Sequence, residues 1–151
     1  MTAKEYLEQA HRLDQRIDSK LEQVEALRCL ATKSTAIIRS HPGGGGNGSF
    51  MEDAVIKIVD LEREIAKEME RLVDLKREIA ETINRVEEPE LQIVLERRYL
   101  NYQRWPEIAK AICYSTKTVR RWHEKALEKV EEVIRKQNIK KRTDSQNIVH
   151  I

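Results

Sequence analysis

The chain has 151 residues, of which 40% are hydrophobic, 36% are charged and only 5% are aromatic. This length allows one or two small domains, and a composition rich in Glu, Lys, Leu and Ile is typical of long helices and coiled coils. No apolar run approaches the ~20 residues that a membrane-spanning helix needs, and the first residues lack the basic and apolar segments of a signal peptide. We therefore expect an all-α, soluble, cytoplasmic protein that does not enter a membrane.

Charge is distributed unevenly along the chain. Residues 1–96 contain 14 Lys/Arg and 20 Asp/Glu, whereas residues 97–142 contain 14 and 5. The first segment therefore carries −6 and the second +9, although the whole chain carries only +2. This separation indicates a charged partner, and nucleic acid is the leading candidate.

The sequence contains no pattern that is typical of a metal site or a catalytic site. Cys29 and Cys113 are far apart and have no CxxC or Cys/His spacing, so we expect two reduced thiols and neither a disulfide nor a zinc site. No serine or cysteine lies in a motif with a histidine base, and the acidic residues have the spacing of a helix surface. We expect neither an enzyme nor a bound cofactor.

The N-terminal segment is predicted to form one long helix, from Thr2 to about Ile38. Thr2 and Glu5 fit a capping box at its start. Apolar residues recur along it at spacings of three and four and so form a single stripe: Leu7, Ala10, Leu13, Ile17, Leu21, Val24, Leu27 and Ala31.

Residues 41–49 read His-Pro-Gly-Gly-Gly-Gly-Asn-Gly-Ser and interrupt this period. They predict a turn or a flexible linker. Gly43, Gly45 and Gly48 match the spacing of a GxGxxG motif, and a phosphate loop would end at Ser49. The preceding element is a helix instead of a strand, and the required lysine is absent, so we do not expect nucleotide binding.

A second long helix is predicted from about Met51 to Val86, and Glu87-Glu88-Pro89 ends it. The two helices most simply form an antiparallel coiled-coil hairpin over residues 1–88, because neither narrow stripe is stable in water alone. Pairing with a second copy of the chain, as a homodimer through the coiled coil, is the open alternative. The stripe consists of Val55, Ile58, Leu61, Ile65, Met69, Leu72, Leu75, Ile79, Ile83 and Val86.

Residues 89–136 are predicted to form a small domain of three shorter helices: Glu90–Tyr99, Trp105–Ile112 and a third from Thr116 to about Arg135. A two-turn helix, a tight connection and a longer basic helix make a helix-turn-helix arrangement, in which the last helix enters the major groove of DNA. Ser115 is suited to cap that last helix.

The two faces of the third helix can be assigned from spacing. Val119, Trp122, Ala126, Leu127 and Val130 would face the domain core. The outward residues of the first turns carry hydroxyl and cationic groups, which major-groove and phosphate recognition require. An ordinary basic surface helix is the alternative interpretation. The predicted DNA-binding residues are Thr116, Lys117, Thr118, Arg120 and Arg121.

Three stretches of this domain resemble the region of bacterial sigma factors that reads the minus-35 promoter element. They are Leu95-Glu-Arg-Arg-Tyr-Leu100, Trp105-Pro-Glu-Ile-Ala109 and Ser115-Thr-Lys-Thr-Val-Arg120, the last followed by Ala126-Leu127. With its coiled-coil segment, the chain is also similar to prophage-encoded late transcription regulators of the ArpU and RinA type.

The resemblance implies specific roles for several residues. Thr116, Lys117 and Arg121 would face bases, and Thr118 and Arg120 would lie nearer to phosphates. Glu107 would accept a structural hydrogen bond. The sequence departs from the pattern at the turn, where Cys113 replaces the usual glycine and makes a left-handed conformation more costly. The sigma regions that bind the minus-10 element and melt DNA are absent.

Two features remain outside the proposed interface. His123 lies at the edge of the buried face, where we expect a hydrogen-bonded or phosphate-facing histidine instead of a metal ligand. Residues 137–151 are expected to form a flexible basic tail, with added phosphate contacts as the alternative. The cationic cluster at this end comprises Arg135, Lys136, Lys140, Lys141 and Arg142.

The sequence thus favours a phage or prophage transcription regulator that binds double-stranded DNA sequence-specifically and whose coiled-coil segment either dimerises or contacts RNA polymerase. One alternative is a DNA-packaging protein like a small terminase subunit, which also combines a helix-turn-helix with a helical hairpin. Another is an adaptor that binds RNA polymerase without reading DNA.

Overall fold

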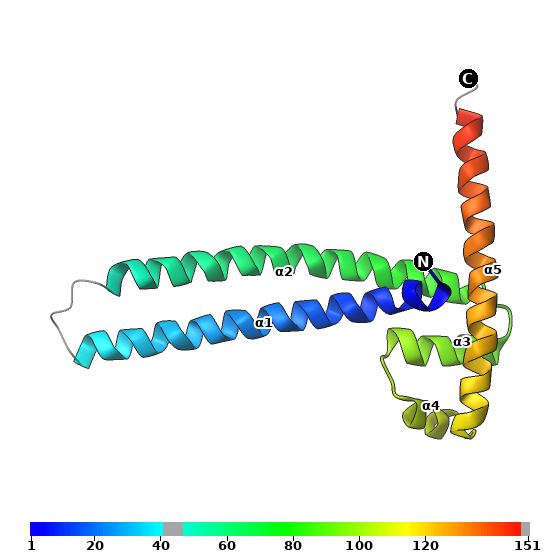
Figure 1. Cartoon of the computed structure of the whole chain (residues 1–151), viewed down its shortest axis with the longest axis horizontal. Helices are drawn as coiled ribbons and strands as arrows, with labels where there is room; N and C mark the ends of the chain where they lie inside the picture. Colours follow the sequence, from blue (N-terminus) through cyan, green and yellow to red (C-terminus); the bar gives the residue numbers. More distant parts are fainter. Residues whose placement is uncertain (41–46, 149–151) are drawn as a thin grey trace. The chain divides into compact units, whose positions relative to one another are not determined.

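The chain folds into helices throughout the part that the structure describes. The structure is a computed structural model that describes residues 1–40 and 47–148, apart from the side chains of residues 38, 47, 48 and 148. Those ranges contain no strand (Figure 1), so the predicted all-α class is confirmed. The elements are α1 (Ala3–Ser40), α2 (Asn47–Asn84), α3 (Pro89–Leu95), a π-helix η1 (Glu96–Leu100), α4 (Trp105–Ile112) and α5 (Thr116–Ile148).

The helices form two compact units whose boundaries fall inside the two long helices. The hairpin unit comprises Arg12–Val73, and the C-terminal unit comprises Met1–His11 together with the chain from Asp74 onward. This division differs from the predicted boundary near residue 88. The start of α1 and the end of α2 belong with the C-terminal helices because their side chains pack there.

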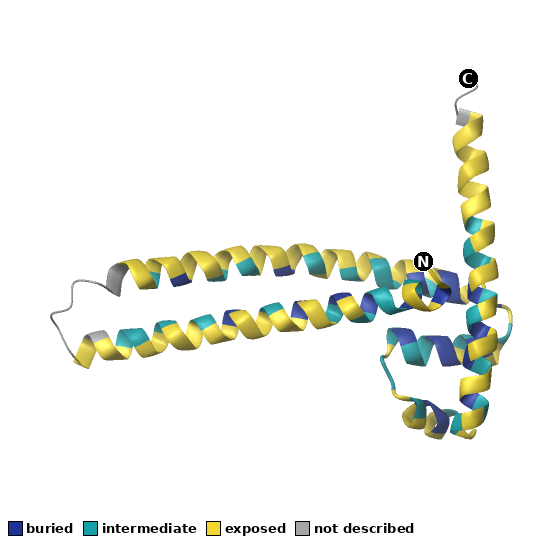
Figure 2. Cartoon of the chain, viewed as in Figure 1, coloured by how far each residue is buried: buried dark blue, intermediate teal, exposed yellow. Residues whose placement is uncertain are grey.

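In the hairpin unit, α1 and α2 run antiparallel. Lys20 of α1 pairs with Glu68 of α2 at 2.9 Å, whereas Arg28, two turns later on α1, pairs with Glu62, which lies earlier on α2, at 2.5 Å. The buried apolar residues form a narrow row along the hairpin (Figure 2). They are Leu13, Ile17, Val24, Ala54 and Ile65.

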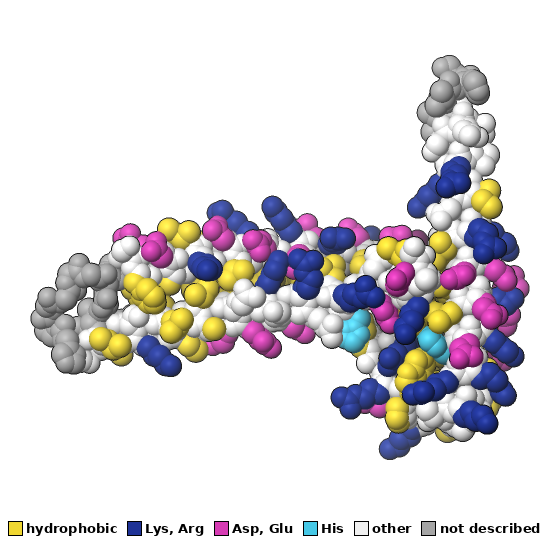
Figure 3. All heavy atoms as spheres, viewed as in Figure 1, with side chains coloured by type: hydrophobic (Ala, Val, Ile, Leu, Met, Phe, Trp, Pro, Cys, Tyr) yellow, Lys and Arg dark blue, Asp and Glu magenta, His cyan; other side chains and the backbone are white. Residues whose placement is uncertain are grey.

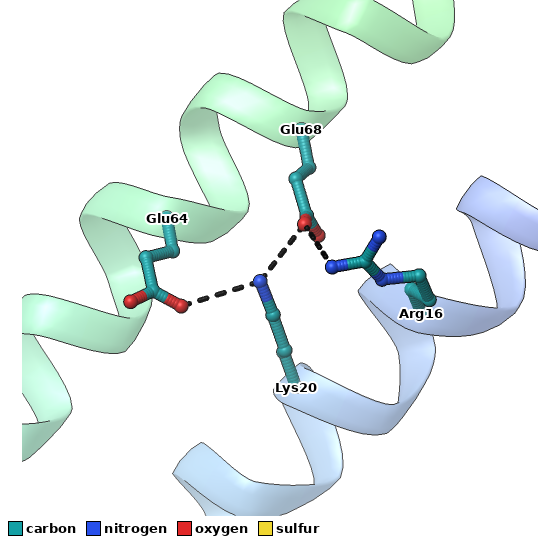
Figure 4. A network of polar contacts seen from close by, with 4 residues as sticks. All are labelled: Arg16, Lys20, Glu64 and Glu68. Carbon is teal, nitrogen blue, oxygen red and sulfur yellow. Dashed lines mark hydrogen bonds and ion pairs between the residues drawn. The ribbon is translucent and has the colours of Figure 1, made fainter.

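A four-residue ion network joins the two helices of the hairpin (Figure 4). Lys20 Nζ lies 3.2 Å from Glu64 Oε2 and 2.9 Å from Glu68 Oε1, and Arg16 Nη2 lies 3.3 Å from the same Glu68 oxygen. The hydrogen bond to Glu68 is the largest cause of a raised pKa for Lys20. Because ion pairs at the protein surface stabilise a fold only weakly, the main effect of the network is to favour the register in which cations of α1 meet carboxylates of α2.

The predicted single stripe holds for only part of each helix. The spacing predicts that Leu21, Val55 and Met69 face the hairpin core, but these residues are 44%, 53% and 44% exposed, respectively. A straight α-helix drifts by about 20° per heptad relative to a 3.5-residue repeat. A long stripe therefore rotates away from its partner, and some of its members reach the surface.

The predicted glycine-rich turn at residues 41–49 lies mostly outside the described residues, because 41–46 are not among them. The GxGxxG and phosphate-loop matches through Gly43 and Gly45 lie outside them as well. α2 already begins at Asn47, so the predicted start near Met51 is too late.

In the C-terminal unit, the first turn of α1 is closed as predicted. Thr2 N–H donates to Glu5 Oε2 at 2.7 Å, and Glu5 N–H donates to Thr2 Oγ1 at 3.2 Å, which is a reciprocal capping box. The hydroxyl groups of Tyr6 and Thr82 are 3.0 Å apart and join α1 to α2. Leu7, Ala10, Ile79, Ile83 and Val86 are buried in the same unit.

The C-terminal helices pack against the first half of α5. Their core contains Val94 of α3, Ile108 and Ala109 of α4 and Val119 of α5, all buried. The partly buried Trp105, Ile112 and Trp122 pack against this cluster.

Two expectations for this region differ from the structure. The predicted helix Glu90–Tyr99 is α-helical only as far as Leu95 and then continues as η1. The expected flexible tail from residue 137 is helical through Ile148, where α5 ends, and residues 149–151 lie outside the described residues. Exposed Lys, Arg, Gln and Asn residues are good or neutral helix formers, so the polar composition of this segment is compatible with helix.

Candidate nucleic-acid interface

The connection between α4 and α5 is a tight left-handed turn. Cys113 ends α4 with φ 60° and ψ 38°, and its N–H donates to the carbonyl oxygen of Ala109. The N–H of Tyr114 also donates to Ala109 O, at 3.1 Å. Glycine usually occupies such a position because a side chain at positive φ costs free energy. The turn at Cys113 therefore has the left-handed geometry that the resemblance to sigma factors implied.

Side chains cap both helices of this motif. Ser115 Oγ accepts a hydrogen bond from Thr118 N–H at 3.2 Å and donates to Thr118 Oγ1 at 2.9 Å. This confirms Ser115 as the N-cap of α5. Glu107 Oε2 accepts from Arg104 N–H at 2.8 Å at the start of α4, so the expected role of Glu107 as a structural acceptor is also confirmed.

The buried side of α5 holds the helix in a fixed rotation about its axis. Val119, Ala126 and Val130 are completely buried, as predicted. Trp122 and Leu127 are only half-buried, and the ring of Trp122 packs edge-on against Tyr114 at 4.6 Å between centroids. The opposite side of the first three turns is consequently directed to solvent.

The five predicted DNA-binding residues occupy different positions on α5. Lys117 and Arg121 are exposed and, four residues apart, lie opposite the buried face. Arg120 is exposed at its edge, with its guanidinium 6.0 Å from the centre of the Trp105 ring. Thr116 and Thr118 are half-buried.

Two further basic residues near the turn were missed in the sequence analysis: Lys110 within α4 and Arg104 at the N-cap of that helix. Arg104 and Lys110 are exposed, and Figure 3 shows Lys and Arg gathered around α4 and the first turns of α5. A two-turn helix is too short for its residue spacing to define a clear polar face. Only the proximity of these residues to the turn could have indicated that they belong to the candidate interface. Glu124 ends the outward cationic face of α5 one turn after Arg120 and Arg121.

Two arginines of η1 have internal roles. Arg98 lies over the ring of Trp105, 4.4 Å from its centre, and donates to Gln103 O at 3.0 Å. Arg97 donates to Gln103 Oε1 at 3.2 Å. These contacts hold the segment before α4 in place and leave Arg104, at the N-cap, and Lys110, within α4, as exposed cations.

His123 lies beneath this surface and is hydrogen-bonded, one of the two predicted alternatives. Its Nε2 is 2.6 Å from the hydroxyl of Tyr99, and its ring packs edge-on against Trp105 at 4.6 Å. Burial, with Arg98 and Lys4 adding to it, lowers the pKa of His123 to about 4. Burial, with Glu8 adding to it, raises the pKa of Tyr99 to about 12. The pair is therefore neutral near pH 7. Through it, the buried side of α5 is hydrogen-bonded to η1.

The part of the chain that the structure describes contains neither a metal-binding cluster nor a membrane-spanning helix. Among residues 1–40 and 47–148, no cluster of three or more His, Cys, Asp or Glu could hold a metal ion. No helix in the same ranges combines the length and apolar character needed to cross a bilayer. Cys29 and Cys113 are both free and exposed.

Residues 34–131 match the family model described as Protein of unknown function (DUF1492). The chain belongs to the DUF1492 family. The DUF1492 match extends from the last turns of α1 through the first half of α5 and includes every residue of the candidate interface. No curated protein and no solved structure matched the chain.

Proposed function

We propose that this DUF1492 protein is a sequence-specific transcription regulator that inserts the start of α5 into the major groove of double-stranded DNA. The observation that carries the proposal is the α4–Cys113–α5 arrangement, in which Lys117 and Arg121 lie opposite the buried face. A short helix, a tight turn and a longer capped helix are the parts by which helix-turn-helix proteins present side chains to base edges.

Each exposed cation then has a role that follows from its position. Arg121, on the outward face, can donate two hydrogen bonds to a guanine, while Lys117 can donate to guanine or to a phosphate. Arg120, which lies beside Trp105, is suited to phosphate contacts. So are Arg104 at the N-cap of α4 and Lys110 within α4, because the first helix of such motifs crosses the DNA backbone. Thr116 and Thr118 are less accessible and contribute less.

The charge distribution supports a polyanionic partner. Residues 97–142 carry +9, whereas residues 1–96 carry −6. Neutralising phosphates releases condensed counterions, so binding should weaken steeply as salt increases. The resemblance to late regulators of the ArpU and RinA type extends the proposal to a phage or prophage regulator that acts in the cytoplasm and contacts RNA polymerase.

The first experiment identifies the DNA. Genomic fragments bound by the purified chain would be selected and sequenced, and enrichment upstream of late phage genes is expected. Enrichment at a packaging site would instead favour the terminase-like alternative. Absence of any retained DNA at low salt, combined with capture of RNA polymerase, would favour the adaptor.

The second experiment tests readout on the selected site. Arg121→Ala should weaken specific binding by about 1 to 3 kcal/mol and relax the preference at one base pair. Arg120→Ala should weaken binding to all sequences similarly and lower the salt slope by about one. Both effects are measured by fluorescence anisotropy at several salt concentrations.

The matched control for these variants is Lys67→Ala, which removes an exposed cation of α2 in the hairpin unit. This control should leave affinity and salt slope unchanged. Equal losses for Lys67→Ala and Arg121→Ala would mean that only net charge matters, and readout by α5 would be rejected.

A further inference from the structure

The hairpin unit exposes more large apolar side chains than it buries. Only four such residues are buried among its described residues, namely Leu13, Ile17, Val24 and Ile65. Soluble proteins rarely expose contiguous apolar patches unless these patches bind a partner. The exposed large apolar residues of the unit are Leu21, Leu30, Ile37, Phe50, Val55, Ile56, Val59, Met69 and Val73.

Several of these residues form a second stripe on α2, distinct from the one that faces α1. The stripe runs Val55, Val59, Glu62, Ala66, Met69 and Val73, with alternating spacings of four and three residues, and all six residues are exposed. Each pair of successive steps adds up to seven residues, which is the heptad repeat of a coiled-coil seam. The face that packs on α1 contains different residues, including Ala54 and Ile65.

Two residues of α1 add to this surface: Arg28 offsets the charge of its one acidic residue, and Leu21 widens its apolar part. Glu62, the single charged member of the stripe, already pairs with Arg28 of α1 at 2.5 Å. Leu21 precedes Arg28 by seven residues and therefore lies on the same side of α1. Its exposed side chain extends the apolar surface from α2 onto α1.

We propose that this stripe is the interface of a homodimer in which the α2 helices of two copies pack antiparallel about a twofold axis near residue 64. The spacing of the stripe reads the same in both directions. An antiparallel pairing consequently places Val55 opposite Val73 of the second copy, Val59 opposite its Met69 and Glu62 opposite its Ala66. A surface that complements itself in this way satisfies the requirement of a twofold-symmetric interface.

Charge distinguishes this arrangement from a parallel one. In the antiparallel pairing, Glu62 meets a small alanine and lies about one turn from Arg63 of the second copy, which has the opposite charge. A parallel pairing would place the Glu62 side chains of both copies in one layer, where like charges destabilise. Self-pairing of the hairpin is therefore antiparallel.

Cysteine cross-linking tests the direction of the pairing. Val55→Cys and Val73→Cys would be made separately in full-length chains carrying Cys29→Ser and Cys113→Ser, and one chain would carry a mass tag. Oxidation of the mixture should give a disulfide between the two different variants. Each variant alone should give little, because its cysteines would lie about 27 Å apart at 1.5 Å per residue. Efficient linking of Val55→Cys to itself, or no linking at all, would overturn the proposal.

Sedimentation measurements test the surface itself. The wild-type chain should be a dimer at micromolar concentrations, and the double substitution Val59→Glu with Met69→Glu should raise the dissociation constant by about tenfold or more. Lys67→Glu, at an exposed polar position of the same helix, is the matched control and should leave the dimer intact. Circular dichroism checks that helicity persists. A monomeric wild type, or a dimer that resists both glutamates, would contradict the assignment.

Discussion

His123 is the residue whose ionisation couples most directly to the fold beneath the proposed DNA-binding surface. Its pKa of about 4 in the folded chain lies below the ordinary 6.5, so the unfolded state binds more protons between these values. The free energy of unfolding should therefore fall as pH decreases from 6.5 to 4. At alkaline pH, Tyr99 has the corresponding effect. Its pKa is raised from 10 to about 12 in the folded chain, so the free energy of unfolding should fall as pH rises from 10 to 12.

Urea unfolding across pH would measure this dependence. His123→Gln should reduce the loss of stability between pH 6.5 and 4, because the titrating group is gone. Tyr99→Phe is the informative control: it removes a hydrogen bond at a cost of about 1 to 3 kcal/mol but should retain the acid-side loss, since burial is the largest cause of the His123 shift. An unchanged acid-side loss in His123→Gln would assign it to other groups.

Helical spacing predicted which cations of α5 face outward, but it predicted the positions of the threonine hydroxyl groups less well. Lys117, Arg120 and Arg121 are exposed because their positions on α5 follow from the buried residues between them. Thr118 could not be placed in the same way, because its hydroxyl is also used by the Ser115 cap. That local bond depends on side-chain rotamers, which periodicity does not specify.

Among the helices, the start of α5 depends on a single capping side chain. Ser115 Oγ accepts the N–H of Thr118 at 3.2 Å, and without it one backbone donor at the helix end would lose its partner. Ser115→Ala should destabilise the C-terminal unit by about 1 kcal/mol, measured by thermal or urea unfolding. Ser115→Asp, which retains a capping oxygen, should be close to wild type. An equal loss in both variants would show that the hydroxyl acts through some other contact.

Element boundaries were predictable only where a strong stop or cap is present. Thr2, Pro89 and Ser115 mark helix starts within one residue of those observed. The far end of α5 contains no proline or glycine that would mark where the helix stops. Its polar composition predicted a flexible tail, but the segment is helical. The π-helical turn Glu96–Leu100 could not be inferred, because tertiary packing around the buried Tyr99 has no separate signature in local propensity.

For the molecule as a whole, periodicity predicted the helical class and the antiparallel hairpin but not the division into units. The apolar stripes continue through both long helices without marking residue 11 or 74, where the units meet. That division arises from contacts between distant segments, such as Tyr6 with Thr82. The second stripe of α2 is equally present in the sequence, but only the exposure of Val59 and Val73 shows that α1 does not cover it.

A twofold dimer would carry two copies of α5, and symmetry then constrains the DNA that it recognises. If both copies engage the same duplex, the selected sites should be inverted repeats, because protein twofold symmetry is mirrored in the operator. Loss of one half-site should weaken binding more than the loss of any single base contact. The dimer-breaking pair Val59→Glu with Met69→Glu should abolish the difference between full sites and half-sites while retaining the effect of Arg121→Ala on a half-site. Binding titrations on both DNAs separate the two ideas: insensitivity to Arg121→Ala counts against readout by α5, whereas full-site preference in the glutamate variant counts against dimerisation through α2.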